Sequence, residues 1–310
     1  MKHLFIINPA AGSRDSSQLY REKILAVCEP KGLDYEIAVS QAPGDCAAIA
    51  RKAAESGEEV RIYSCGGDGT LNEVISGVVG YPNVAVTMFA GGSGNDFIKI
   101  FNKTAPFRDL ERLLDCKEER FDLIQCNEDV GMNITSVGLD ARIAMDVANY
   151  KRLPLLHGFR AYAVSTVVNT IRGVKEHYVV EIDGERIDGQ QTMICACNGR
   201  FYGGGFNPVP EADPTDGYLD VLLVTGVSRL KVAGIVGTYK KGGYKKLPKV
   251  IRHFRTKSVR ILCDKPTCIN LDGEMRTATD IRISIADKKI RFFYPKELTW
   301  QNTSAPQPVG

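Results

Sequence analysis

The sequence predicts an α/β protein of two domains, in which a parallel α/β domain is followed by a mainly antiparallel β-sandwich domain. Before about residue 124, apolar runs alternate with stretches of helical apolar spacing, and such repeated β–α units predict a parallel sheet covered by helices. After that point, short strands bounded by turn residues dominate the pattern. We therefore expect domains at 1–124 and 125–289, and a polar, disordered tail at 301–310.

The elements expected in the first domain follow a regular β–α order. The expected strands are 4–7, 34–39, 60–64 and 84–89, and the expected helices are 17–31, 45–55 and 71–79. Thr70 and Glu73 stand at the spacing of a capping box, which predicts that the third helix starts at the glycine turn before it.

The second domain is expected to consist mostly of strands. These are 121–125, 179–182, 192–198, 219–224, 258–262, 280–286 and 290–294, interrupted by helices at about 157–173 and 228–238. Turn residues predict hairpins at Asp183-Gly184 and at Ala286-Asp287-Lys288.

The composition excludes several classes of protein. A hydrophobic content of 44% is ordinary for a globular protein, and a net charge of +3 favours no class of partner. Nine cysteines without regular spacing and four scattered histidines argue against a zinc site. The apolar start is too short for a signal peptide, and no apolar run is long enough to span a membrane. We expect a cytoplasmic protein that meets the inner membrane face only at its surface.

Three loops of the first domain carry the chemistry of a phosphate site. They are Asn8–Ser13, Gly66–Thr70 and Gly92–Asp96, and each follows a different expected strand. Loops at the carboxyl ends of parallel strands meet at one edge, and glycines let the backbone approach a phosphate closely. Asp68 needs a cation between itself and a phosphate, which favours phosphoryl transfer with magnesium. Each loop alone is also typical of a simple strand–helix turn.

The ordered set of motifs resembles the bacterial diacylglycerol kinase and related lipid kinase family, which is similar to sphingosine and ceramide kinases. The matching segments are 8–12, 66–73, 92–97, 216–220 and 271–274, and they span nearly the whole chain. The resemblance implies ATP and Mg²⁺ as cofactors and transfer of the γ-phosphoryl group to a lipid hydroxyl, above all diacylglycerol to phosphatidic acid. It also implies that the strand within 290–300 returns to the first domain.

The loops and the resemblance together select the candidate residues of the nucleotide site. By resemblance, Asp68 handles the magnesium of Mg-ATP, the glycine amides hold phosphate, and Asp96 is a second acid nearby. Ser93 and Lys99 stand where the family commonly has threonine and arginine. The candidates are Asn8, Pro9, Ala10, Ala11, Gly12, Ser40, Gly66, Gly67, Asp68, Gly69, Thr70, Asn72, Glu73, Gly92, Ser93 and Asn95.

Two acidic turns of the second domain also match the family. By resemblance, Asp213, Asp216 and the backbone of Tyr218 hold a structural magnesium ion, with Asp122 as an outer partner. On local grounds, 213–218 is equally typical of a Pro/Gly turn before a strand.

Asp272 and Glu274 are the candidates for the base that accepts the hydroxyl proton. In an extended segment, their alternation places both side chains on one face. The sequence alone leaves the choice between them open, and Asp272-Gly273 by itself is typical of a hairpin turn.

The stretch Lys240–Arg260 is rich in lysine and arginine and lies in a region without acids, from Val221 to Cys263. This predicts transient contact with an anionic membrane. Nucleic acid, which we do not expect as a partner, is the rival interpretation, and a solvated helical face is the simplest one. The apolar segment Leu155–Tyr162 is a candidate for lipid access. A homodimer stays open.

Two other functions compete with a lipid kinase. NAD kinases share the Gly-Gly-Asp-Gly-Thr loop but not the Asn8-Pro9 opening or the Asp216 and Asp272 turns. A non-catalytic nucleotide or lipid sensor on the same scaffold is the second. A nicotinamide dehydrogenase and a P-loop kinase are disfavoured because the chain lacks GxGxxG at its first helix and lacks GxxxxGK[ST].

Overall fold

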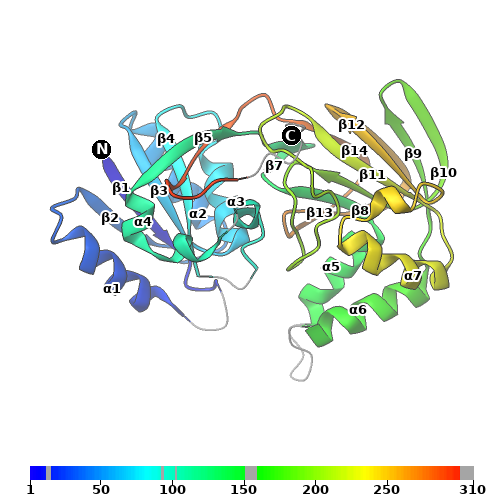
Figure 1. The fold of residues 1–310 in the computed structure, drawn as a ribbon, viewed down its shortest axis with the longest axis horizontal. Helices are drawn as coiled ribbons and strands as arrows, with labels where there is room; N and C mark the ends of the chain where they lie inside the picture. Colours follow the sequence, from blue (N-terminus) through cyan, green and yellow to red (C-terminus); the bar gives the residue numbers. More distant parts are fainter. Residues whose placement is uncertain (12–14, 92–93, 102, 151–158, 301–310) are drawn as a thin grey trace, which may run out of the picture. The chain divides into compact units, whose positions relative to one another are not determined.

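The computed structural model describes residues 1–11, 15–91, 94–101, 103–150 and 159–300. They form two compact units, which are described separately (Figure 1). Of the described residues, unit 1 comprises Met1–Leu123 and 286–300, and unit 2 comprises Ile124–Ile285. Chain from both ends therefore builds unit 1.

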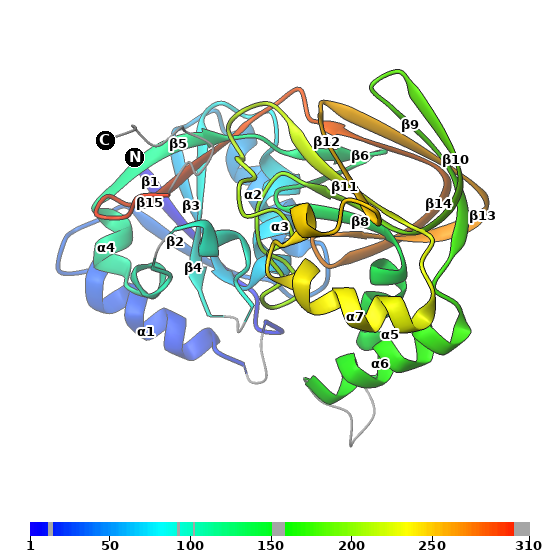
Figure 2. The same ribbon diagram turned by 45° about the vertical axis from the view of Figure 1, so that its right-hand side comes forward.

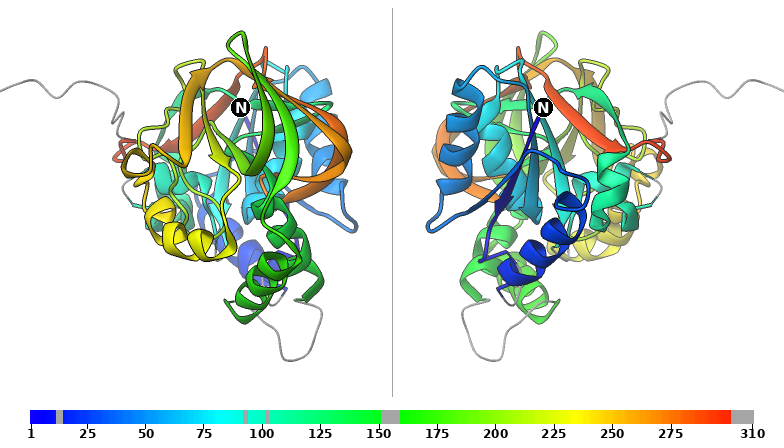
Figure 3. Two further views of the ribbon diagram at one scale, coloured as in Figure 1. Left: turned by 90° about the vertical axis from the view of Figure 1, so that its right-hand side faces the viewer. Right: turned by 90° about the vertical axis from the view of Figure 1, so that its left-hand side faces the viewer.

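Unit 1 contains a six-stranded sheet in the order β2-β1-β3-β4-β15-β5. The first five strands in this order are parallel, and β5 runs antiparallel to β15 at the edge. Helices α1 and α4 lie on one face, and α2 and α3 lie on the other (Figure 3). The strands are β1 (Lys2–Ile7), β2 (Tyr35–Val39), β3 (Val60–Gly66), β4 (Val84–Ala90), β5 (Cys116–Phe121) and β15 (Ile290–Pro295). The helices are α1 (Ser17–Cys28), α2 (Asp45–Glu55), α3 (Asp68–Val78) and α4 (Leu110–Leu114), with short 3-10 turns at Phe97–Ile100 and Ala105–Arg108.

The register of the sheet brings the strand ends level with one another. Ile7 of β1 pairs with Cys65 of β3, and Gly66 of β3 pairs with Ala90 of β4. All residues of β4 are buried, as expected for a central strand covered on both faces. The loops that follow β1, β3 and β4 therefore leave the sheet at the same edge.

Unit 2 is a nine-stranded antiparallel sheet covered by three helices (Figure 2). The strand order is β12-β11-β10-β8-β13-β14-β6-β7, and β9 pairs with β10 and β13. The strands are β6 (Ile124–Cys126), β7 (Asp129–Gly131), β8 (Ile134–Gly138), β9 (Glu176–Ile182), β10 (Glu185–Cys197), β11 (Leu219–Thr225), β12 (Ile251–Thr256), β13 (Ser258–Leu271) and β14 (Glu274–Ile285). The helices are α5 (Leu139–Tyr150), α6 (Phe159–Arg172) and α7 (Arg229–Lys240), with a 3-10 turn at Tyr244–Lys246.

Side chains alternate between two cores across this sheet. In β10, Ile194 and Ala196 belong to one apolar cluster, whereas Met193, Cys195 and Cys197 belong to the other. The second cluster packs against Val232 and Ile235 of α7. Both faces of the middle of β10 are therefore covered. Together with the parallel sheet of unit 1, this antiparallel unit confirms the predicted fold class.

Several local predictions need correction. The turn at Asp183-Gly184 is confirmed, and both residues have positive φ angles between β9 and β10. Residues 286–288 do not form a hairpin, because β14 and β15 belong to different sheets. The strands β7, β8 and β12 and the helix α5 were not predicted.

The predicted capping box is also absent. Helix α3 begins at Asp68, so Thr70 lies inside its first turn, and no side chain caps it. The N–H groups of the first turn of α3 therefore donate no hydrogen bond to a capping side chain among the described residues.

A close approach of helices α2 and α3 depends on Gly77. A Cβ atom at this position would collide with the backbone carbonyl of Ala47, which cannot move without shifting α2. We expect Gly77→Ala to lower the free energy of unfolding by about 1–3 kcal/mol in urea denaturation. Gly234→Ala on α7 is the matched control, because the new methyl group meets nothing within 4 Å. It should raise stability by about 0.5–1 kcal/mol, and equal effects of both changes would contradict this packing argument.

Candidate functional site

The turn between β3 and α3 forms an open helix N-terminus. Gly67 is the N-cap residue in extended conformation and supplies no side-chain acceptor to the first turn. A Cβ atom at Gly66 would collide with the hydroxyl of Thr70, so only glycine fits there. The first N–H groups of α3 and the helix dipole favour an anion at this end. The turn therefore has the geometry of a phosphate site.

The loop after β1 contacts the same turn. Asn8 Nδ2 donates to Thr70 Oγ1 at 3.2 Å, and the N–H of Ala10 donates to Asn8 Oδ1 at 3.0 Å. The N–H of Gly91, after β4, donates to the carbonyl of Gly66 at 2.9 Å. Loops from three strands thus meet at one edge, as predicted. Of the predicted nucleotide residues, Gly12, Gly92 and Ser93 lie outside the described residues.

Asp68 is oriented by the backbone of the third loop. Its Oδ1 accepts hydrogen bonds from the N–H groups of Asp96 at 2.6 Å and Phe97 at 3.4 Å. A Cβ atom at Gly94 would lie 3.0 Å from Asp68 Oδ2, so the glycine leaves room beside that oxygen. A carboxylate that is oriented beside a phosphate-binding turn is a suitable ligand for Mg²⁺. The residues present therefore fit the metal of Mg-ATP.

Three other residues predicted for the nucleotide site have different contacts from one another. Asp96 is buried and forms an ion pair with Lys99, so its charge is already compensated. Glu73 accepts the N–H of Gly44 at 3.2 Å and so stabilises the start of α2. Asn72 is buried, and its Oδ1 has no hydrogen-bond partner among the described residues.

Ser40 follows β2 and is likewise buried near this edge. Its N–H donates to the carbonyl of Ile7 at 2.9 Å, which keeps the end of β2 beside the end of β1. It lies in unit 1 with the other nucleotide candidates.

Asp272 lies in unit 2, in a two-residue hairpin turn between β13 and β14. Asp272 and Gly273 have φ angles of 50° and 97°, so the segment is a turn and not the extended strand we expected. The Asp272 carboxylate accepts the N–H groups of Met132 at 2.5 Å, Asn133 at 2.9 Å and Ile134 at 2.7 Å. Three backbone donors stabilise the negative charge of this carboxylate and hold its orientation.

The same loop is held from a second side by the chain after β10. Asn198 Nδ2 donates to the carbonyl of Met132 at 2.7 Å, and the N–H of Gly199 donates to the carbonyl of Asn133 at 2.8 Å. Glu274 is half-exposed and lies 3.7 Å from the guanidinium of Arg276. The two candidate bases thus differ, since three backbone N–H groups hold Asp272, whereas Glu274 is half-exposed and faces Arg276.

The residues predicted to hold a structural magnesium ion form hydrogen bonds with protein groups. Asp216 accepts the N–H of Tyr218 at 2.9 Å and a hydrogen bond from Arg255 at 2.7 Å. Burial raises the pKa of Asp216, and the Arg255 hydrogen bond opposes this. Asp213 accepts both the N–H and the hydroxyl of Thr215.

Arg255 occupies the place of a cation beside Asp216, so these residues do not fit a metal as they are arranged. In the part of the chain that the structure describes, no three His, Cys, Asp or Glu side chains gather as metal ligands. Asp122 is buried in unit 1 and pairs with Lys289 at 2.8 Å. We derive no step of the reaction from this turn.

Four of the nine cations in the basic stretch 240–260 pair with acids from other segments. Lys245 pairs with Glu211, Arg252 with Glu185, Arg255 with Asp216, and Arg260 with Glu181 and Asp280. The arginines of this stretch are therefore neutralised, although no acid lies within the stretch itself. Cations without an acidic partner among the described residues include Lys240, Lys241, Lys246, Lys249 and Lys257.

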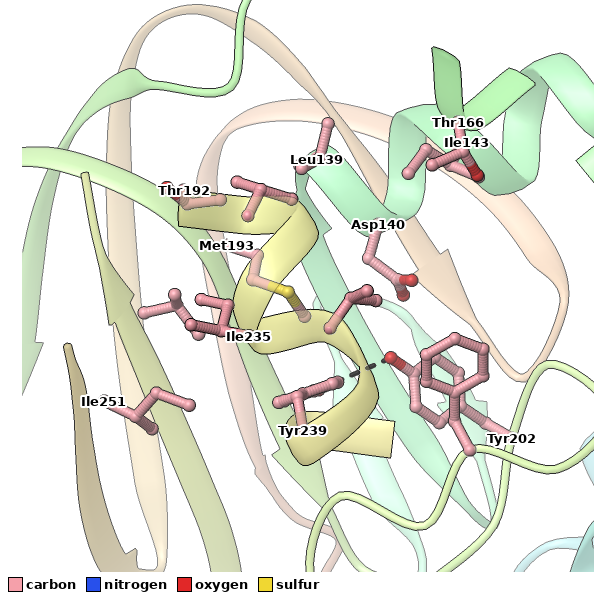
Figure 4. A pocket seen from close by; sticks show the side chains of 14 residues that line it. Leu139, Asp140, Ile143, Thr166, Thr192, Met193, Tyr202, Ile235, Tyr239 and Ile251 are labelled. Atoms are coloured by element: carbon pink, nitrogen blue, oxygen red, sulfur yellow. Dashed lines mark hydrogen bonds between the residues drawn. The ribbon is translucent and has the colours of Figure 1, made fainter. Parts of the chain in front are cut away.

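Unit 2 contains an apolar pocket that the sequence analysis missed. It has a cavity volume of about 80 Å³ and lies between α5, α6 and α7 and the sheet (Figure 4). Its walls include Leu139, Ile143, Met193, Val224, Val232 and Ile235. Of the predicted lipid-access segment Leu155–Tyr162, residues 155–158 lie outside the described residues, and 159–162 begin helix α6, which contributes Thr166 to the pocket wall.

Asp140 is the one carboxylate that lines this pocket among the described residues. Its Oδ2 accepts a hydrogen bond from Ser136 Oγ at 2.8 Å, and Tyr202 and Tyr239 lie nearby with hydroxyls 3.4 Å apart (Figure 4). Burial raises the pKa of Asp140 to about 6, although hydrogen bonds from Ser136 and Tyr202 act in the opposite direction. An isolated acid in the apolar run 134–145 was the only sequence signal for it.

Comparisons with known families agree with this division of the chain. A family model described as "Diacylglycerol kinase catalytic domain" matches residues 2–126. A second, described as "YegS C-terminal NAD kinase beta sandwich-like domain", matches residues 133–294, just over half of the chain. The chain belongs to the diacylglycerol-kinase-like lipid kinase family.

Individual relatives of this lipid kinase family are distant. A "putative lipid kinase" of Staphylococcus aureus is 26% identical over 76% of this chain and 78% of its own. One of Staphylococcus epidermidis is 27% identical over 76% of this chain and 77% of its own. The crystal structure of a "putative diacylglycerol kinase" from Bacillus anthracis has a TM-score of 0.74 at 20% identity, covering 94% of this chain and 96% of its own, and so shares the fold. No helix within the described residues could cross a membrane.

The raised pKa of Asp140 makes stability depend on pH. Between about pH 4 and pH 6 the folded protein binds a proton that the unfolded chain has already lost, so the free energy of unfolding falls as pH rises. Asp140→Asn should remove this fall in the free energy of unfolding. The gain in stability of the variant over wild type should be about 1–3 kcal/mol larger at pH 7.5 than at pH 4. Urea denaturation at both pH values measures the difference. The exposed Asp287→Asn serves as control, and an equal stability gain at both pH values would refute the assignment.

Proposed function

We propose that this protein is an ATP-dependent lipid kinase that transfers the γ-phosphoryl group to a lipid hydroxyl, with diacylglycerol as the first substrate to test. The observation that carries the proposal is Asp68, which stands in the first turn of α3, after the glycine turn, with one carboxylate oxygen held by backbone N–H groups of the third loop. Phosphoryl transfer depends on positioning and charge neutralisation, and this geometry supports both.

Unit 1 supports the nucleotide half of the reaction. The N–H groups at Gly67–Gly69 favour the phosphates, and the loops at Asn8 and Gly94 border the same turn. Asp68 is the residue that would hold Mg²⁺, which neutralises phosphate charge when bound. Asp96 contributes by orienting Asp68 through its backbone N–H, since its own carboxylate is paired with Lys99.

Unit 2 supports the acceptor half. We propose Asp272 as the group that orients the hydroxyl and accepts its proton. In a loose transition state the proton leaves late, so a well-positioned carboxylate serves better than a strongly basic one. The three N–H bonds to Asp272 supply that positioning. The apolar pocket in the same unit is a suitable place for an acyl chain.

The site also suggests where the protein works. A kinase that takes a lipid substrate must reach a membrane, and we propose a cytoplasmic protein that binds the inner face transiently. An assay with radiolabelled ATP, Mg²⁺ and a panel of lipids in mixed micelles tests the function. Activity on NAD alone would show an NAD kinase, and nucleotide binding without turnover would show a sensor.

We expect Asp68→Asn to reduce kcat by about 10²–10³-fold, because it removes the charge that holds the cation. The amide oxygen can still accept the N–H of Asp96, so the fold should persist. The lipid kinase assay measures the loss, and thermal unfolding confirms the fold. Asp34→Asn, an exposed change in the same unit, is the matched control. Unchanged turnover in Asp68→Asn would rule out its proposed role.

The two candidate bases can be separated by paired amide substitutions. Asp272→Asn places an NH₂ group against backbone donors, so it should cost about 1–3 kcal/mol of stability and at least about 10²-fold in kcat. Glu274→Gln is half-exposed and should change stability by less than about 0.5 kcal/mol, with kcat nearly retained. If Glu274→Gln abolishes turnover at full stability, the base is Glu274 instead.

A further inference from the structure

Helix α6 has its polarity reversed relative to an ordinary surface helix. Its buried side carries Ser165 and Asn169, which donate to the carbonyl of Ile143 and to the carboxylate of Asp146, both at 2.8 Å. Its solvent side carries Val167 and Ile171, which are 58% and 65% exposed. A surface helix normally shows the opposite arrangement, so this exposed apolar side indicates an apolar environment outside the protein.

Helix α7 extends the same apolar surface. Leu230 is 88% exposed, and Val236 is also exposed. Arg229 Nη2 donates to the carbonyl of Ile171 at 2.6 Å, which holds the start of α7 beside the end of α6. We call these exposed side chains of the two helices the α6–α7 face. Its members are Val164, Val167, Ile171, Leu230 and Val236.

The exposed charges of α7 have one sign. Helix α7 contains no acidic residue, and exposed cations flank its apolar residues at both ends. Asp146, the acid of α5 nearest to α6, is engaged by Asn169 and Arg172. An apolar surface with a basic border is typical of proteins that lie on anionic lipid. The flanking cations are Arg229, Lys231, Lys240 and Lys241.

One residue belongs both to the α6–α7 face and to the apolar pocket. Val236 is exposed on the α6–α7 face and also lines the pocket, together with Thr166 of α6. The inner side of α7 contributes Val232, Ile235 and Tyr239 to the pocket wall. The two sides of α7 therefore connect an outer apolar surface with an inner apolar cavity.

We propose that the α6–α7 face is the surface on which the protein docks to an anionic lipid bilayer, and that the pocket behind it receives an acyl chain directly from that bilayer. The second part rests on the proposed lipid kinase function, whereas the docking does not. This assigns membrane contact to α6 and α7, with Lys240 and Lys241 as the only part of the stretch 240–260 in the basic border. The three arginines of that stretch, Arg252, Arg255 and Arg260, are paired with acids.

Docking is tested by sedimentation with vesicles, without nucleotide, so that the result does not depend on catalysis. Wild-type protein should bind vesicles of equal phosphatidylglycerol and phosphatidylcholine more tightly than vesicles of phosphatidylcholine alone. The double variant Ile171→Gln/Leu230→Gln should bind at least about tenfold more weakly, because two large apolar side chains no longer enter the lipid. Leu19→Gln, at an exposed leucine on α1 of unit 1, is the matched control and should bind like wild type.

Three results would overturn the docking. These are equal vesicle binding by the double variant and wild type, no binding of wild type to either vesicle, and a wild-type dimer that the double variant converts to monomer. The last would show that the α6–α7 face joins two copies of this chain. Light scattering of both proteins in solution separates that case.

Chain uptake is tested by Val236→Trp at the mouth of the pocket. This variant should keep vesicle binding, because tryptophan is favourable at a membrane interface. It should raise the KM for dioleoylglycerol in vesicles at least about fivefold, with little change for a soluble short-chain diacylglycerol. An unchanged KM would refute uptake through this mouth. Wild type that binds vesicles but phosphorylates no lipid would instead refute the proposed function and leave the docking standing.

Discussion

The nucleotide half of the structure depends on the absence of a side chain at Gly66. The hydroxyl of Thr70 occupies the space of the missing Cβ atom, and Asn8 donates to that hydroxyl. The carbonyl of Gly66 in turn accepts the N–H of Gly91. The loops after β1, β3 and β4 are thus connected through one residue, and the open N-terminus of α3 lies between them. A larger residue at position 66 would push these three loops apart, and it would thereby disturb the whole site.

Five aspartates among the candidate site residues fall into two groups, according to which groups contact their carboxylates. Three of them form ion pairs with side chains, which compensate their charge: Asp96 with Lys99, Asp122 with Lys289 and Asp216 with Arg255. Asp68 and Asp272 instead accept backbone N–H groups. Such donors orient a carboxylate and stabilise its charge without supplying a full positive charge. This difference explains why we assign chemistry to Asp68 and Asp272 and structural roles to the first three.

The sequence predicted what depends on local pattern and missed what depends on distant partners. The fold class followed from the change in periodicity near residue 124, and the Asp183-Gly184 turn followed from residues that tolerate positive φ. Residues 286–288 carry equally good turn signals, yet they link two sheets, because strand pairing is decided by the whole unit.

The candidate site shows the same limit. The glycine loops were visible as motifs, but the anchoring of Asp272 by Met132–Ile134 joins positions about 140 apart in the chain. The neutralisation of Arg252 and Arg255 by Glu185 and Asp216 is equally non-local. Asp140 was not a candidate, because its burial depends on α7 and on tyrosines that lie far from it in the sequence.

The exposed apolar surface and the buried apolar pocket of unit 2 answer one physical problem. Each CH₂ group of a lipid that passes through water costs about 0.8 kcal/mol, so a long acyl chain cannot leave a bilayer unaided. A pocket alone does not solve this, because the chain must still cross the water layer at the protein surface. An apolar face around the mouth removes that layer when it lies on lipid. Leu230 and Ile171 are unfavourable in water for the same reason that they are useful at a bilayer, which is why we connect the α6–α7 face with the pocket.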